Sequence, residues 1–226
     1  MSSINVRPIT KQNLDLPITN TTKQANIIGI IPNSIETKHL IEEVDVNESL
    51  LFQTSTQRDQ LKMVVAERHK ALGTVGVAIL KGLGITSGAI VATIAHDSHN
   101  IVAVGVNDED ILFGLDVIQQ LKGGVAIVDN GKVLASVSLP IAGLMSNQKF
   151  EYVYGQLEAL NKALADIGFK QKFNPFLTLS FLALPVIPEL KLTDQGLFKV
   201  SEFSHIKVDE VVQKVDFDND GYAEEA

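Results

Sequence analysis

Three consecutive stretches decide the fold: Gly88-Ala89-Ile90-Val91-Ala92-Thr93-Ile94, then Ala95-His96-Asp97-Ser98-His99-Asn100, then Ile101-Val102-Ala103-Val104-Gly105-Val106. The first and last are rich in Val and Ile, which favours β-strands. The polar residues between them form the connection where the chain reverses, because Asn, Asp and Ser bond nearby backbone groups in turns. Such a turn places polar side chains at the edge of a core, where binding sites are usually built.

Two long helices and further strands extend outward from this stretch. Asn107 is followed by Asp108-Glu109-Asp110, which predicts a capped helix start with negative charge in its first turn. Apolar spacings of three and four predict a second helix over about 147–167. Strands are expected over 26–31, 37–46, 63–66, 88–94, 101–106, 125–129, 132–137 and 176–183. The pattern predicts an α/β (α+β) fold, with a mixed, largely antiparallel sheet flanked by helices.

The composition favours one folded domain with short extensions. We expect a polar arm over 1–24, a domain over 25–208 and an acidic tail over 209–226. Hydrophobic residues make up 45% of the 226 residues, enough for one sizeable core. The uncharged range 176–183 is bounded by prolines, which predicts a central strand with Phe181 buried.

Charge and cysteine content exclude several classes of function. The net charge is −8 and no block of Lys and Arg occurs, which disfavours nucleic-acid binding. The chain has no cysteine, which rules out disulfides and thiolate metal sites and fits a cytoplasmic protein. The longest apolar run, 176–187, is 12 residues, whereas a membrane helix needs roughly 20. We therefore expect neither a nucleic acid nor a membrane as a partner.

The candidate site residues are His96, Asp97, Ser98, His99 and Asn100. His96 and His99 are weak metal candidates, because a spacing of three suits a helix but points to opposite faces of a strand. A hydrogen-bonded turn with one imidazole facing a ligand is the favoured interpretation. His96-Asp97-Ser98 has the residue types of a hydrolytic triad, but adjacent residues do not normally reach the required geometry.

Arg68 and His69 follow another apolar strand and are the remaining candidates. They are suited to contact a substrate or a neighbouring domain. The alternative is a solvated strand end with Arg68 paired to a carboxylate, and the residues alone favour that alternative.

An ordered series of segments resembles the C-terminal domain of bacterial adenine deaminase, a member of the amidohydrolase superfamily. The segments are Ala25–Asn33, Thr37–Leu40, Glu67–Lys70, Lys81–Gly84, Ala95–Asn100, Ile101–Asp110, Leu139–Ser146 and Asn174–Leu190. Proteins of this family carry a metal-binding (β/α)8 barrel before this region, with a His-x-His pair. No two of the five histidines here have that spacing. The resemblance therefore implies that the barrel lies outside this chain, which would be a fragment, one half of a split enzyme or a separate domain.

The resemblance implies a hydrolytic function in purine metabolism. Adenine and water would give hypoxanthine and ammonia, with manganese, iron or zinc in the barrel activating the water. This chain alone is then expected to be inactive and to hold no metal. It would contribute His96, Asp97, Ser98, His99 and Asn100, with Arg68 and His69, to the substrate pocket or the barrel interface.

Two alternatives of other classes remain open. One is a non-catalytic binding or assembly module that kept the fold, and the other is an independent metallohydrolase that uses His96 and His99. Metal content of the purified chain distinguishes them. The sequence leaves the oligomeric state open, including a homo-oligomer.

Overall fold

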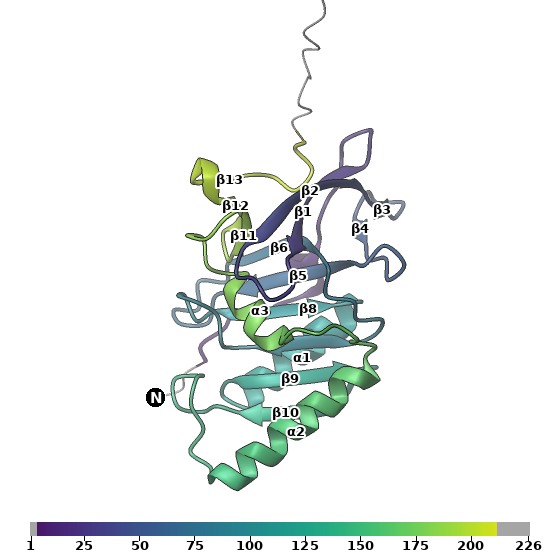
Figure 1. Cartoon of the computed structure of the whole chain (residues 1–226). Helices are drawn as coiled ribbons and strands as arrows, with labels where there is room; N and C mark the ends of the chain where they lie inside the picture. The colour runs from purple at the N-terminus through teal and green to yellow at the C-terminus, as the bar shows by residue number, and fades with distance from the viewer. Residues whose placement is uncertain (1–3, 212–226) are drawn as a thin grey trace, which may run out of the picture.

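One mixed sheet dominates the computed structural model, which describes residues 4–211 (Figure 1). Its strand order is β10-β9-β7-β8-β5-β6-β1-β2. The strands are β1 (Gln24–Ile30), β2 (Thr37–Glu43), β5 (Gln60–Ala66), β6 (Val75–Lys81), β7 (Ala89–Ala92), β8 (Ile101–Gly105), β9 (Gly124–Asp129) and β10 (Lys132–Ser138). Only β1 and β6 are parallel among these neighbours. The predicted mixed, largely antiparallel sheet is confirmed.

Helices cover both faces of the sheet. In Figure 1, α1 (Asp108–Gln120) lies behind the sheet, whereas α2 (Phe150–Asp166) and α3 (Pro175–Phe181) lie in front. Successive residues of a strand point to opposite faces, so Val64 of β5 packs in the α1 layer and Met63 packs in the layer that includes the α2 and α3 side chains. Strands buried on both faces explain the continuous Val and Ile runs in the sequence.

Short elements complete the chain. They are β3 (Asp45–Val46) with β4 (Phe52–Gln53), β11 (Leu190–Thr193) with β12 (Gly196–Lys199) and β13 (Ser204–His205), and the 3-10 turns Lys11–Leu14 and Val200–Glu202. The β11–β12 turn packs directly on β6 at Gly76. A Cβ at Gly76 would lie 2.0 Å from the carbonyl oxygen of Thr193, so only glycine permits this contact.

The predicted start of α1 is confirmed. The side-chain oxygen of Asn107 accepts the backbone N–H of Asp110 at 2.7 Å, and Asp108, Glu109 and Asp110 occupy the first turn. Ile111, Leu115 and Ile118 are buried against the sheet, as their spacing predicts.

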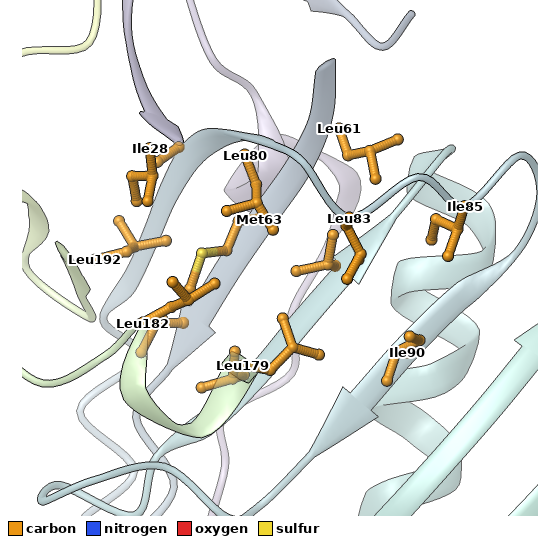
Figure 2. Close-up of a cluster of buried hydrophobic side chains, with 14 of the residues drawn as sticks. Ile28, Leu61, Met63, Leu80, Leu83, Ile85, Ile90, Leu179, Leu182 and Leu192 are labelled. Atoms are coloured by element: carbon orange, nitrogen blue, oxygen red, sulfur yellow. The ribbon is translucent and has the colours of Figure 1, made fainter. Parts of the chain in front are cut away.

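The predicted strand over 176–183 is wrong, because this segment contains α3. Asn174 caps the helix by accepting the Leu177 N–H at 3.1 Å, and Pro175 occupies the first turn. Asn followed by Pro is a signal for the start of a helix. The lack of charged residues over 176–183 favoured a buried strand instead. Leu179 and Leu182 pack on the front of the sheet beside Met63 (Figure 2). Phe181 is half-buried rather than central.

Other boundaries also differ from the sequence expectations. The expected strand over 37–46 is divided into β2 and β3, and β6 had not been expected. Residues 4–24, expected as a polar arm, pack against the sheet. Their side chains Leu14, Leu16 and Ile18 are buried in the core. Residues 212–226 of the expected acidic tail lie outside the described residues. No helix within 4–211 is long and apolar enough to cross a membrane.

Two leucines one turn apart on α2 test the packing of this layer. Leu160 is 1% exposed, whereas Leu157 is 46% exposed. Leu160→Ala should lower the free energy of unfolding by about 2–5 kcal/mol, because it leaves a cavity under α2. Leu157→Ala should cost well below that in urea unfolding followed by circular dichroism. Equal losses from the two variants would contradict the placement of α2.

Candidate functional site

The polar candidates lie where several strands end at one edge of the sheet. Ala66 at the end of β5 pairs with Ile101 at the start of β8, and Ala92 at the end of β7 pairs with Val125 of β9. Gly124 pairs with Ser138 at the end of β10. The loops 67–74, 93–100 and 139–149 therefore emerge side by side, and we name them together the rim.

The turn 95–100 brings the two histidines together. The His99 N–H donates to the Ala95 carbonyl at 2.7 Å, and the His96 and His99 ring centroids are 6.5 Å apart. The His96 ring packs on Phe181 of α3 with centroids 4.6 Å apart, and the backbone N–H of His96 donates to the Ser180 carbonyl at 2.8 Å. Helix α3 therefore positions His96 at the rim, a role that the sequence did not indicate for Phe181.

The side chains of this turn do not form a hydrolytic triad. Ser98 Oγ accepts the Asn100 N–H at 3.3 Å, and no hydrogen bond recorded within 4–211 joins it to an imidazole. Asp97 and Ser98 are exposed at the tip of the turn. The turn therefore presents hydrogen-bonding groups at a surface, without an activated nucleophile.

The buried side chain of Arg68 connects two rim loops, 93–100 and 139–149, by hydrogen bonds. Its side chain is 1% exposed, and its Nε donates to the His99 carbonyl while Nη2 donates to the Ala142 carbonyl at 3.0 Å. The guanidinium lies over Gly143, where a Cβ would be 2.8 Å from Nη2. Burial lowers the pKa of Arg68 from its usual value. The expected solvated strand end is therefore wrong for Arg68, which is buried beneath two loops.

Thr93 makes a second connection between two rim loops. Its hydroxyl donates to the Gly143 carbonyl at 2.5 Å and accepts the Gly124 N–H at 2.9 Å. Thr93 is buried, so these bonds are shielded from water. The turn after β10 is thus fixed to the end of β7.

The N-terminal segment also joins the rim. The Asn5 N–H donates to the Arg68 carbonyl at 2.8 Å, and the Ala71 N–H donates to the Asn5 carbonyl at 3.1 Å. His69 is exposed, and its Nε2 is 2.8 Å from the Ser98 carbonyl oxygen. Residues at the start of the described chain therefore touch the loop that carries Arg68 and His69.

Glu67 shapes the first rim loop. Its carboxylate accepts the backbone N–H groups of His69 at 2.5 Å, Lys70 at 2.7 Å and Leu72 at 2.9 Å. Burial alone would raise the pKa of Glu67, but the three N–H donors stabilise the charged form and lower it below its usual value.

Asn100 adds an unsatisfied polar atom at the base of the turn. It is 3% exposed, and its Nδ2 donates to Asp194 Oδ1 at 3.2 Å. Asp194 Oδ2 accepts the Thr74 hydroxyl at 2.5 Å, which joins the β11–β12 turn to the rim. The Asn100 Oδ1 is buried and has no hydrogen-bond partner within 4–211. Asp194 is distant in sequence, and no local pattern pointed to it.

A hollow outside the three rim loops is a competing site. It is lined by residues that include Asn26, His39, Glu189, Lys199 and His205. Its polar groups already bond one another: His39 Nε2 is 2.7 Å from Asn26 Oδ1, and Ser201 donates to Glu189. Burial lowers the pKa of His39, and nearby Lys199 lowers it further. These internal pairs identify the hollow as a structural junction.

The fold and the rim define an α/β domain whose polar surface loops are held in place by buried hydrogen bonds. Within residues 4–211, no group of three or more His, Asp or Glu side chains is placed to hold a metal ion. Residues 34–204 match the family model described as the adenine deaminase C-terminal domain, and the chain belongs to that family.

Similar curated proteins are adenine deaminases of bacteria. That of Halalkalibacterium halodurans is 54% identical over 206 residues, covering 91% of this chain and 35% of that protein. That of Geobacillus kaustophilus is 48% identical over 211 residues, covering 93% and 36%. That of Bacillus subtilis is 50% identical over 201 residues, covering 89% and 34%. The chain spans about a third of the length of these relatives.

Acid sensitivity tests the role of Glu67. Its folded-state pKa is lowered, so its stabilising effect is fully present above pH 4.5 and is lost as pH falls through the folded value. Glu67→Gln should lower the free energy of unfolding by about 1–3 kcal/mol at pH 7, as for hydrogen bonds to a charged group. The difference from wild type should shrink below about pH 4 in urea titrations. A difference independent of pH would refute this role.

Proposed function

We propose that this chain is the C-terminal domain of an adenine deaminase, which hydrolyses adenine to hypoxanthine and ammonia together with a separate catalytic domain. The observation that carries the proposal is the family match over 34–204 with relatives named adenine deaminases. Those relatives are about three times as long as the matched region, which leaves room for a complete catalytic domain.

The rim is the part of this chain proposed to serve the reaction. His96, Asp97, Ser98 and His99 offer imidazole, carboxylate and hydroxyl groups, which can hydrogen-bond the polar edge of a purine. Arg68 and Glu67 hold the loops that present these groups, and fixed positions are what a pocket wall requires. The buried, unpartnered Oδ1 of Asn100 supplies one further acceptor beneath the turn.

The catalytic metal is proposed to lie in the other domain. Hydrolytic deamination needs an activated water, and a bound divalent ion lowers the pKa of water to near neutrality. The residues described here do not fit such an ion, since no suitable group of three ligands occurs among them. We therefore assign manganese, iron or zinc to the barrel domain of the parent enzyme. We also place the protein in the cytoplasm, which suits a chain without cysteine.

A second candidate function is a binding or assembly module without a catalytic role. The exposed apolar side chains of the rim, among them Ile141 and Met145, favour a protein contact. The two functions differ in whether rim substitutions change turnover or only assembly.

Reconstitution tests the leading proposal. The purified chain, supplied with Mn²⁺, should release no ammonia from adenine. Co-expression with the N-terminal two-thirds of the Halalkalibacterium halodurans relative, the part unmatched by this chain, should give an active complex. Turnover above roughly 1 per second by the chain alone would contradict the proposal. So would an N-terminal part whose activity is unchanged by this chain.

Substitutions at the rim test the pocket role. His99→Ala or His96→Ala in the co-expressed pair should lower kcat/KM by about tenfold, the effect of losing one hydrogen bond. The melting temperature of His99→Ala should change little, because its ring is partly exposed. His205→Ala, an exposed histidine outside the three rim loops, is the matched control and should retain activity. Full activity with much earlier melting in both rim variants would show that the histidines are structural.

A further inference from the structure

An apolar surface runs from the rim onto the first half of α2. Its members are large hydrophobic side chains that remain at least 45% exposed: Ile141, Met145, Phe150, Tyr154 and Leu157. Phe150 is 77% exposed and Tyr154 is 55% exposed. We name this set the α2 flank. Single exposed apolar residues are ordinary, but five of them within one loop and the helix that it enters indicate an interaction site.

The helical spacing explains why the α2 flank is separate from the core. Phe150, Tyr154 and Leu157 follow the spacing i, i+4, i+7 and share one side of α2. Leu160, Ala163 and Leu164 occupy the core side and are buried. The Phe150 and Tyr154 rings stack with centroids 6.1 Å apart and planes 29° apart. A stacked aromatic pair is a preorganised contact surface, because little side-chain freedom is lost on binding.

The α2 flank is continuous with the rim. Ile141 and Met145 belong to the loop that leads into α2, and their backbones pair with each other. Between them, the Ala142 carbonyl accepts from Arg68 and the Gly143 carbonyl accepts from Thr93. The same guanidinium bonds the His99 carbonyl. The loop that carries Ile141 and Met145 is therefore joined to the His96 turn through one guanidinium.

We propose that the α2 flank is the docking surface for the N-terminal catalytic domain of adenine deaminase. This inference rests on the proposed function and specifies the surface through which it acts. The matched family is a C-terminal domain, so the unmatched two-thirds of each relative precede the matched region. The first described residues lie at the rim, where Asn5 bonds Arg68 (Figure 1). The preceding domain is thus tethered beside the surface that it would cover.

A second copy of this chain is the other occupant to consider. Strand β10 is the free edge of the sheet nearest α2, and edge strands invite pairing between copies. However, its register shifts between Val133 and Ala135, a bulge that disturbs regular pairing. The bulge therefore disfavours strand pairing between copies at β10, whereas the α2 flank stays exposed to solvent.

Two tyrosines on α2 give a matched test. Tyr154 lies in the α2 flank, whereas Tyr152, 59% exposed, points to the opposite side of the helix. This chain is co-expressed with the N-terminal two-thirds of the Halalkalibacterium halodurans adenine deaminase, and complex formation is measured by affinity capture and light scattering. Tyr154→Glu should weaken the complex at least tenfold, because it buries an unpaired charge. Tyr152→Glu should leave the affinity unchanged.

The outcomes separate this inference from the proposed function. An active wild-type complex that Tyr154→Glu and Tyr152→Glu affect equally, or not at all, overturns the α2 flank and leaves the proposed function standing. Absence of any wild-type complex or activity overturns both. A dimer of this chain alone that Tyr154→Glu dissociates assigns the surface to a second copy, which also overturns the inference. The melting temperature of each variant checks that the chain remains folded.

Discussion

The buried guanidinium of Arg68 is the interaction on which the rim depends. It bonds the carbonyls of His99 and Ala142, which belong to loops that follow different strands. Carbonyl groups at the ends of strands lose their sheet partners and are costly to bury alone. One planar cation with five donors satisfies several of them at once, which a lysine does not do with the same geometry. Loops that would otherwise be independent therefore share one fixed arrangement.

The sheet makes this arrangement possible. Antiparallel pairing of β5 with β8 and of β7 with β9 brings loops that are distant in sequence to a single edge. The carboxylate of Glu67 and the hydroxyl of Thr93 then add further hydrogen bonds at that edge. The front helices add the remaining constraint, since α3 supports the His96 ring through Phe181. The edge is thus rigid enough to present side chains to another molecule.

Family membership and geometry lead to the same view of the molecule. The chain matches the adenine deaminase C-terminal domain and covers about a third of its relatives. The described residues provide a braced polar turn and an adjoining apolar flank but no metal-binding group. Exposed apolar side chains gathered beside polar groups are typical of a protein contact surface. Such a surface suits a domain that completes a site built elsewhere.

The sequence by itself determined the strands that are buried on both faces, the capped start of α1 and the turn at 95–100. Each of these is specified by neighbouring residues, such as Asn107 bonding Asp110 or the polar run between two Val- and Ile-rich segments. The tertiary structure decided the rest. It buried Arg68 under two loops, brought Asp194 to Asn100, and placed Phe181 of a helix, not a strand, beneath His96. These contacts join residues from 31 to 94 positions apart only because the sheet aligns its strand ends, so no local pattern encodes them.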